Sequence, residues 1–333
     1  MYLPGATCIF TFHEKKHMFS PLTRRLMGLL IWIPLAACTK KGDSPATPSA
    51  KDTVFTATYQ TAQLTQSMLF RLSDTFHLKT GALPELSGLV RASDTRSSEY
   101  WGEEDSGNKN AIYLLDTLGR LLGAKYLPVF NRDWEDMACG PGPENGRFYL
   151  YLGDIGDNLH LFPFITVYRF IAPSPDTALW TDSLISKFDA LNFIYPDGPH
   201  DAEALMVDPL TKDIYVLTKE AKAGLYVGRY PQNTGEAGRL VKLGTLPIST
   251  VTAADITLDG NGIFIKNYDN IFYWTRKNGQ SIASCLQQPP QRLAYQKEPQ
   301  GESIALDPSG KGFFTISEKV GTSVQVLYHY VSR

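Results

Sequence analysis

The sequence feature that most constrains the fold is an internal repeat. Residues 202–220, AEALMVDPLTKDIYVLTKE, align without gaps with residues 301–319, GESIALDPSGKGFFTISEK. The alignment matches Glu203 with Glu302, and each glutamate is followed by the same Asp-Pro pair. Two copies of one supersecondary unit indicate a fold that is built by repeating that unit.

Weaker copies of the unit carry an acidic residue in the same context. With the two clear copies they make five acidic markers, Glu85, Glu135, Glu203, Asp255 and Glu302. Successive markers lie roughly 50 to 70 residues apart, which is enough for four short strands with their turns. A carboxylate in an apolar strand is costly unless it is paired, hydrogen-bonded or bound to a metal. The markers therefore need a common explanation.

A second marker recurs in the same order along the chain. An apolar residue followed by tyrosine appears once in each unit, at Tyr113, Tyr168, Tyr226, Tyr273 and Tyr328. We interpret these tyrosines as large aromatic side chains that pack between units, and we assign them no chemistry.

These repeats predict an all-β fold, a β-propeller of five four-stranded blades. The unit that begins at Glu203 reads as four strands with turn formers between them. The last unit supplies only three strands, so we expect a strand at 68–78 to complete it and close the propeller. Six blades stay open if a degenerate blade lies within 135–203 or 52–84. A β-sandwich would explain the strands but not the two recurring markers.

The N-terminal region predicts secretion and lipid attachment. Met18 to Cys38 has basic residues at Arg24 and Arg25, then an apolar run, then small residues, which is typical of a signal peptide. We expect residues 1–37 to be that signal, with Met18 as an alternative start of translation. The sequence Leu-Ala-Ala-Cys that ends at Cys38 resembles the lipobox of bacterial lipoproteins, in which the cysteine is lipidated.

A flexible tether and one folded domain are expected after the signal. Residues 38–51 are rich in Ser, Pro, Ala and Lys, as flexible linkers are, and residues 52–333 form the expected propeller domain. The protein is therefore predicted to lie in the cell envelope, anchored by its N-terminal lipid to a bacterial membrane, either in the periplasm or exposed on the surface. We expect it to be a monomer.

Charge and cysteine content exclude some functions. The chain has 32 Lys and Arg against 34 Asp and Glu, a net charge of −2, and no basic stripe, so no nucleic-acid partner is expected. Cys139 and Cys285 stand at unrelated positions in the folded part and form neither a disulfide framework nor a zinc motif. We expect them to be two buried thiols.

Propeller geometry brings two groups of polar residues to one face. Residues at the start of each blade's first strand converge there with residues in the loop after the second strand. The first group contains the five acidic markers, which we predict as ligands of a metal ion. The second group is predicted to line the binding face and comprises Asp105, Asp154, Asp157, Asn158, Lys219, Asn267 and Lys319, with His200 at its edge.

Oxygen ligands without a nearby cysteine pair favour a hard cation such as Ca²⁺ or Mg²⁺ over zinc, and we take Ca²⁺ as the expected cofactor. One alternative stays open, because propeller blades often carry a polar residue that only hydrogen-bonds the neighbouring blade. His200 also has two readings, as a base at the channel mouth or as a surface histidine of a loop.

The segment ELSGLV followed by EEDSGNKNAIYLLDTLGR resembles the blade signature of secreted bacterial propellers of the phytase-like and esterase-like phytase families, and more distantly that of lactonase and gluconolactonase propellers. The resemblance implies a channel-centred Ca²⁺ site, with Glu85, Glu135, Glu203 and Glu302 as candidate ligands, and hydrolysis of phosphoesters or esters. The chain departs from these families in having Asp255 in place of a glutamate, Glu104 where relatives often carry Asn, and no basic cluster for a polyphosphorylated substrate.

Two classes of function follow from these patterns. The first is a Ca²⁺-dependent hydrolase of phosphoesters, esters or lactones, in which the cation activates water and polarises the substrate. The second is a non-enzymatic module that binds a small molecule, glycan, peptide or protein partner. A glycosidase with two acidic residues ranks below both, because it gives no reason for a marker in every blade.

Overall fold

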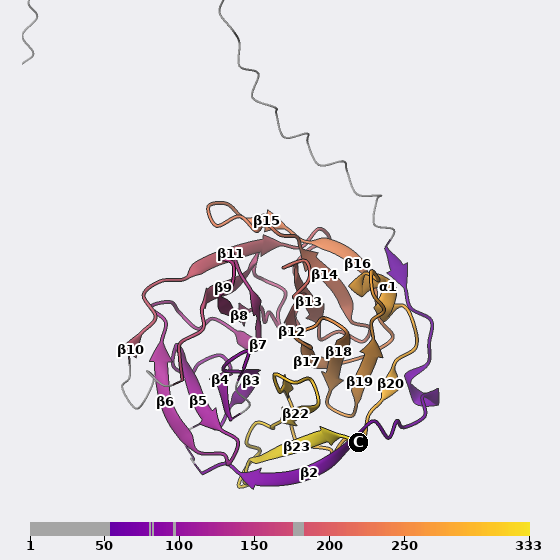
Figure 1. The fold of residues 1–333 in the computed structure, drawn as a ribbon. Coiled ribbons are helices and arrows are strands. Elements are labelled where there is room, and N and C mark those ends of the chain that lie inside the picture. Colours follow the sequence, from indigo (N-terminus) through magenta and orange to yellow (C-terminus); the bar gives the residue numbers. More distant parts are fainter. Residues whose placement is uncertain (1–53, 80, 82, 96–97, 176–182) are drawn as a thin grey trace, which may run out of the picture. The chain divides into compact units, whose positions relative to one another are not determined.

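The computed structural model describes residues 54–79, 81, 83–95, 98–175 and 183–333. The predicted signal peptide, the lipidation site Cys38 and the tether lie outside these residues. The described chain forms five antiparallel sheets arranged around a common axis as the blades of a five-bladed β-propeller (Figure 1). The all-β prediction with five blades is therefore confirmed.

Each blade has its first strand nearest the axis, and the strands follow one another outward. Blade 1 contains β3 (Leu86–Arg91), β4 (Glu99–Glu104), β5 (Ala111–Asp116) and β6 (Leu121–Tyr126). Blade 2 contains β7 (Trp134–Pro141), β8 (Phe148–Asp154), β9 (Ile165–Ile171) and β11 (Asp189–Ile194). Blade 3 contains β12 (Ala202–Val207), β13 (Ile214–Thr218), β14 (Gly224–Gly228) and β16 (Val241–Thr245). Blade 4 contains β17 (Val251–Ile256), β18 (Gly262–Asn267), β19 (Ile271–Thr275) and β20 (Gln291–Arg292).

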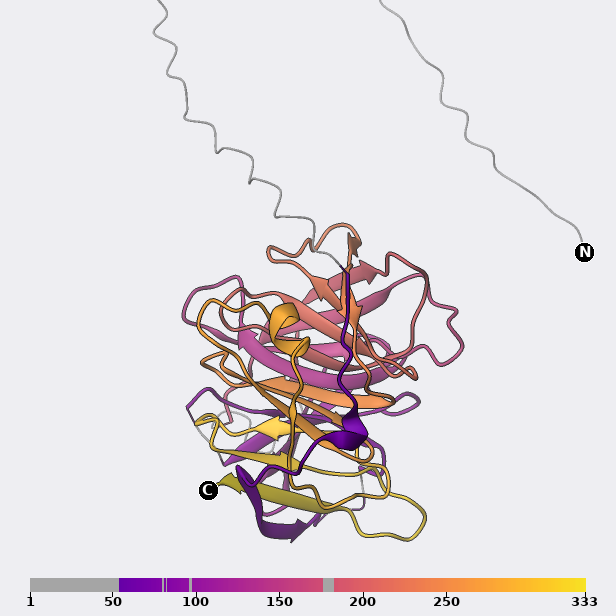
Figure 2. The same cartoon turned by 90° about the vertical axis from the view of Figure 1, so that its right-hand side faces the viewer.

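Blade 5 closes the ring with strands from both ends of the described chain. It contains β21 (Ala305–Leu306), β22 (Gly312–Thr315), β23 (Val326–Ser332) and, as its outermost strand, β2 (Phe70–His77). Strands β2 and β23 pair antiparallel from Phe70 opposite Ser332 to His77 opposite Val326. The prediction that a strand at 68–78 completes the last blade is confirmed, and Figure 2 shows β2, in indigo, beside β23, in yellow.

Short elements decorate the outer edges of the blades. Three two-residue strands add in parallel to the outer strands of blades 1, 2 and 3, namely β10 (Ser183–Leu184), β15 (Gly238–Arg239) and β1 (Phe55–Thr56). The helical elements are a 3₁₀ turn, η1 (Thr61–Gln63), and α1 (Ile282–Leu286), which Ser281 caps by accepting a hydrogen bond from Ser284 N. No helix in the described ranges is long and apolar enough to cross a membrane.

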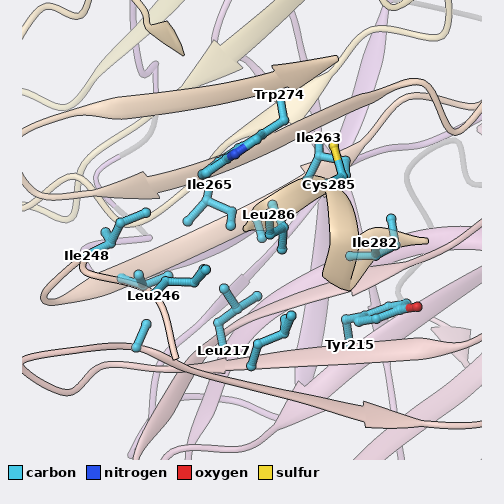
Figure 3. Close-up of a cluster of buried hydrophobic side chains, with 14 of the residues drawn as sticks. Tyr215, Leu217, Leu246, Ile248, Ile263, Ile265, Trp274, Ile282, Cys285 and Leu286 are labelled. Atoms are coloured by element: carbon cyan, nitrogen blue, oxygen red, sulfur yellow. The ribbon is translucent and has the colours of Figure 1, made fainter. Parts of the chain in front are cut away.

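The hydrophobic core is divided into five clusters, each between two neighbouring blades. Figure 3 shows the cluster between blades 3 and 4, where Tyr215 and Leu217 face Ile263, Ile265 and residues of α1. The five recurring tyrosines lie on the third strand of each blade and pack in or against these clusters, as predicted. Cys139 and Cys285 are buried free thiols, which was also predicted.

Two buried carboxylates hold the inner strands of different blades together. Asp136 in β7 accepts hydrogen bonds from Leu205 N of blade 3 at 2.8 Å and from Ala254 N of blade 4 at 3.4 Å. Asp255 in blade 4 pairs with Arg91 of blade 1 at 2.8 Å, and both side chains are buried. Because breaking a buried ion pair leaves an uncompensated charge, these contacts fix the blades around the axis.

Candidate cation site where the first strands begin

A β-bulge recurs at the start of the first strand in blades 1 to 4, and in blade 5 the register changes between the bridge Gly301–Ser317 and β21. These irregularities fix where the polar residues go. In blade 2 the pairing shifts between Trp134 and Asp136, so that Glu135 is the extra residue. In blade 3 the shift falls between Ala202 and Ala204, at Glu203. The corresponding residues of blades 1, 4 and 5 are Ser87, Thr252 and Glu302. Each of them directly follows the last residue that is paired before the register changes. An extra residue re-aims its side chain locally, which explains how an acid can stand in an apolar strand.

Three sets of equivalent positions meet at this end of the axis. The bulge set is Ser87, Glu135, Glu203, Thr252 and Glu302. The second set lies two residues before the bulge set and is Glu85, Asp133, Asp201, Thr250 and Gln300. The third set directly follows the second strand, or its last paired residue, and is Asp105, Ile155, Lys219, Tyr268 and Glu318. Backbone hydrogen bonds such as Lys219 N to Asp201 O, at 3.0 Å, join the second and third sets within a blade.

Five carboxylates from blades 1, 2 and 3 cluster at this end, and we call them the acidic mouth: Asp105, Asp133, Glu135, Asp201 and Glu203. Ligand oxygens of Asp105, Asp133 and Glu135 all lie within 4.8 Å of one another, as do those of Glu135, Asp201 and Glu203. Glu135 belongs to both triads. Like charges this close repel one another, so the arrangement calls for protonation or for a cation.

Hydrogen bonding leaves part of the acidic mouth unsatisfied. Glu135 and Glu203 are 4% and 3% exposed. Lys219 Nζ pairs with Glu203 Oε1, but Glu203 Oε2 is buried without any hydrogen-bond partner. Asp201 is better satisfied, because its Oδ1 accepts from Asp157 N at 2.9 Å. A buried carboxylate oxygen without a partner is costly, and a water molecule or a cation bound there would satisfy it.

Burial and mutual repulsion raise the pKa values of Asp105, Asp133, Glu135 and Glu203. Burial raises the pKa of Glu203 to about 8 despite the opposing effect of Lys219. The pKa of Glu135 is raised well above its usual range by burial and then by the charge of Glu203. Burial likewise raises the pKa of Asp105 to about 6. Shifts of this kind gather at functional sites more often than elsewhere.

Gly156 explains why a GDIGDN motif follows β8. A methyl group at this position would collide with Glu135 Oε1 and with the carboxylate of Asp133. The glycine therefore leaves the space that the two carboxylates occupy. The next residue, Asp157, folds the loop back by accepting hydrogen bonds from Leu161 N and Phe162 N, both at 2.8 Å.

Blades 4 and 5 place a different group beside the acidic mouth. Tyr268 donates to Glu302 Oε1 at 2.6 Å, and Lys219 Nζ lies 3.9 Å from the same oxygen. Glu318 accepts from Gln300 through Oε2, whereas its Oε1 is buried and unpartnered. Burial, followed by the charge of Glu302, raises the pKa of Glu318 to about 9. Burial alone would lower the pKa of Lys219, but Glu203 outweighs it and raises that pKa.

The predicted place of Asp255 in the ring of markers was wrong. The register shows that Thr252, three residues earlier, occupies the bulge in blade 4. Asp255 instead accepts from Arg91 Nη2 at 2.8 Å and from Leu306 N at 2.9 Å, so its oxygens are engaged in holding blades together. A short sequence match cannot show a bulge, which is why the alignment slipped.

Glu85 was also misaligned. The bulge position of blade 1 is Ser87, whose hydroxyl donates to Glu135 O at 2.8 Å. Glu85 stands where Asp133 and Asp201 stand in the next two blades, but it is exposed and accepts a hydrogen bond from Asn108 at 2.5 Å. It lies outside both carboxylate triads.

The predicted binding-face residues divide into several environments. Asp105 and Lys219 belong to the site or border it. Asp154 and Asn267 shape the backbone: Asp154 accepts from Asp133 N at 3.0 Å, and Asn267 accepts from Asp269 N and Asn270 N. Asn158 and Lys319 are exposed.

His200 has partners of its own away from the acidic mouth. Its Nδ1 lies 2.6 Å from Glu220, and its Nε2 lies 3.2 Å from Asp197 and 2.9 Å from the hydroxyl of Tyr226. Lys242 also pairs with Asp197, at 2.6 Å. These contacts tie the loop before β12 to the outer strands of blade 3, so the structure favours a loop histidine over a base at the acidic mouth.

Asp133, Asp201 and Glu318 were not among the predicted site residues. Their signal was position, since each stands at a fixed offset from a bulge. Tyr268 and Gln300 carried no signal, because a tyrosine and a glutamine in these loops have many ordinary uses.

Fold and site together define a five-bladed β-propeller with a buried acidic cluster that can hold a metal ion. The chain matches no protein-family model, and comparison with curated proteins finds no significant relative. The site must therefore be interpreted from its own chemistry.

Proposed function

We propose that the acidic mouth binds a hard divalent cation, with Ca²⁺ as the expected ion, and that the protein is a Ca²⁺-dependent hydrolase of ester, lactone or phosphoester bonds. The observation that carries the proposal is the buried Oε2 of Glu203, which has no hydrogen-bond partner, on a carboxylate that belongs to a triad whose ligand oxygens lie no more than 4.8 Å apart. Oxygens that share one Ca²⁺ at about 2.4 Å lie at most about 4.8 Å apart.

The donor chemistry favours Ca²⁺ over transition metals. Within the described ranges, both triads consist of carboxylates alone, without histidine or cysteine. Hard oxygen donors of variable geometry suit Ca²⁺, whereas zinc prefers sites with nitrogen or sulfur. A bound divalent cation would also offset the repulsion among the five acids, whose neighbouring positive charges include Lys219, paired with Glu203, and Arg132, next to Asp133.

The surrounding residues support a hydrolytic reaction. A cation at this place supplies Lewis-acid activation of water and of a carbonyl or phosphoryl oxygen. Lys219 stands between Glu203 and Glu302 and is placed to bind an anionic oxygen of the substrate. Glu318, with a pKa of about 9 and a free buried oxygen, keeps a proton at neutral pH that it can give to a leaving group. The resemblance to phytase-like and esterase-like propellers supports the same class of reaction.

We also propose that Cys38 carries a lipid that anchors the protein in the cell envelope. The support is the apolar run and the Leu-Ala-Ala-Cys ending of the signal. Metabolic labelling with a palmitate analogue in a bacterial host, followed by fractionation, tests it. Label and membrane association should both be lost in Cys38→Ala, and label that survives this substitution would contradict the proposal.

The experiment for the site combines binding with turnover. Ca²⁺ binding is measured by calorimetry for the wild type, for Glu203→Gln and for Glu144→Gln, which removes an exposed carboxylate from a β7–β8 turn. Hydrolysis of p-nitrophenyl acetate, p-nitrophenyl phosphate and a γ-lactone is followed in parallel. We expect Glu203→Gln to lose both binding and turnover and Glu144→Gln to keep both. Ca²⁺ binding without any turnover would leave a cation-dependent binding module, and absence of Ca²⁺ binding would refute the site.

A further inference from the structure

Two loops beside the acidic mouth expose large apolar side chains. Phe130 is 81% exposed in the loop before β7, and Leu159 and Leu161 are 75% and 69% exposed in the loop between β8 and β9. Phe162 and Phe164 of the second loop are 36% and 38% exposed. We call these five residues the apolar rim. Single exposed apolar residues are ordinary, but several on adjoining loops mark a binding surface.

The first of these loops is anchored to the acidic mouth. Asn131, next to Phe130, donates through Nδ2 to Glu104 O at 2.9 Å and to Asp105 O at 3.0 Å. Asn131 Oδ1 in turn accepts from Trp134 N at 3.1 Å. Phe130 is therefore held on the chain segment that leads directly into Asp133.

The second loop is anchored just as firmly. Asp157 N donates to Asp201 Oδ1 at 2.9 Å, and the Asp157 carboxylate accepts from Leu161 N and Phe162 N. His160 Nδ1 lies 3.2 Å from Pro199 O. The backbone of this loop is thus fixed while Leu159 and Leu161 point to solvent, so their exposure belongs to a built surface.

Arg132 joins the two loops. Its guanidinium lies 4.3 Å above the ring of Phe162, and it donates to Phe164 O at 3.1 Å and to Asp154 O at 2.8 Å. The residue stands between Phe130 and Asp133 in sequence, so one side chain connects the loop that carries Phe130 to the loop that carries the leucines.

We propose that the apolar rim and the cation site together bind a free amphiphile, with a carboxylate or carboxylate-ester head on the cation and a medium-length acyl tail on the rim. This inference rests on the proposed cation site and names the substrate class that fits it. A cation held by buried acids attracts an oxygen-rich anionic head, and the apolar surface that begins beside it covers a tail. The cation site alone would require only an anionic head, and the apolar rim alone would require only an apolar tail. Their proximity favours one ligand that has both.

The recessed position of the acids favours a free amphiphile over a membrane surface. Glu135 and Glu203 are almost fully buried, whereas the rim leucines project from the loops above them. A slender head can reach a cation at that depth while its tail lies across the rim. A lipid headgroup held in a bilayer plane would have to leave that plane to make the same contact.

The test uses decanoate below its micellar concentration and acetate as the head without the tail. Binding to the purified protein is measured by calorimetry with Ca²⁺ and after EGTA. The double variant Leu159→Ser, Leu161→Ser replaces the two leucines of the five-residue apolar rim without changing a carboxylate. Leu210→Ser is the matched control, because Leu210 is 60% exposed on the turn after β12, at the other end of the axis.

We expect the Ca²⁺-loaded wild type to bind decanoate at least about tenfold more tightly than the EGTA-treated protein or the double variant. Acetate should bind equally weakly to all variants, and Ca²⁺ affinity should be unchanged in the double variant. Equal decanoate affinity in the wild type and the double variant would overturn the inference. In a parallel sedimentation assay with phosphatidylserine vesicles, Ca²⁺-dependent vesicle binding by a protein that does not bind decanoate would also overturn it. Loss of Ca²⁺ binding itself would instead refute the proposed function, on which this inference depends.

Discussion

Glu135 is the residue whose neutralisation tests the acidic mouth most sharply. It belongs to both carboxylate triads and has no ion pair in the described part of the chain, so Glu135→Gln removes a charge without breaking a salt bridge. At a pH where its neighbours are ionised, a single carboxylate whose oxygen lies no more than 4.8 Å away repels Glu135 by at least about 3 kcal/mol at an effective dielectric constant of about 20. Without Ca²⁺, the substitution should therefore stabilise the fold.

The expected shift in melting temperature follows from the size of the domain. A folded unit of about 280 residues has an unfolding entropy of about 0.6 kcal/mol/K, so about 3 kcal/mol raises Tm by about 5 °C. Ca²⁺ at about 100 times its Kd adds about 2.7 kcal/mol to the wild type, again about 5 °C. The variant should gain less than about 1 °C from Ca²⁺, because it lacks the ligand shared by both triads.

Differential scanning fluorimetry at pH 9, with EGTA or CaCl₂, measures both effects. Glu144→Gln serves as the control and should behave as the wild type. At pH 5 the advantage of Glu135→Gln should disappear, because the raised pKa of Glu135 leaves that carboxyl protonated and neutral in the folded wild type. A variant that melts below the wild type in EGTA at pH 9, or that keeps the Ca²⁺ shift, would refute the reasoning.

Three further predictions follow from the structure. Asp255→Asn should lower the free energy of unfolding by about 3 to 5 kcal/mol in urea titrations, because it leaves Arg91 buried without its counter-charge. Ca²⁺ binding should be unchanged in this variant. A mild effect on stability would mean that Arg91 finds another partner. Ca²⁺ affinity measured by calorimetry should rise from about pH 5.5 to about pH 8.5, because protons compete with Ca²⁺ for Asp105, with a pKa of about 6, and for Glu203, with a pKa of about 8. An affinity that does not change with pH would exclude these two residues as ligands. Phe70→Ala should cost about 3 to 5 kcal/mol, because it removes the packing of the closing strand against Phe264 of blade 4 and Phe313 of blade 5. An unchanged urea midpoint would show that this strand does not hold the ring closed.

The fold could be predicted from the sequence because its cause is periodic. Each blade needs a buried first strand, turn formers and an aromatic residue on the third strand, so the same pattern of residue types recurs along the chain. The match between residues 202–220 and 301–319 has the same register in the structure, since Glu203 and Glu302 both occupy a bulge. Closure by the strand at 68–78 followed from the missing fourth strand of the last unit.

The site could be predicted only in part, because one residue of slippage changes where a side chain points. The weaker copies placed Glu85 and Asp255 two residues before and three residues after the bulge positions Ser87 and Thr252. Side chains alternate between faces along a strand, so a shift of three residues turned a supposed ligand into the partner of Arg91.

The sequence by itself determined the repeated four-stranded unit, the closing strand and the end of the axis where acids gather, because local residue patterns dictate these, whereas the choice of five blades over six came from the structure. Tertiary structure alone decided which acids meet. Asp105, Asp133, Glu135, Asp201 and Glu203 come from three blades, and their mutual distances depend on how neighbouring blades pack and where each bulge falls. Burial, which raises the pKa of Glu203 and leaves its Oε2 without a partner, is likewise a property of the assembled propeller, because water is excluded only once the blades are in place.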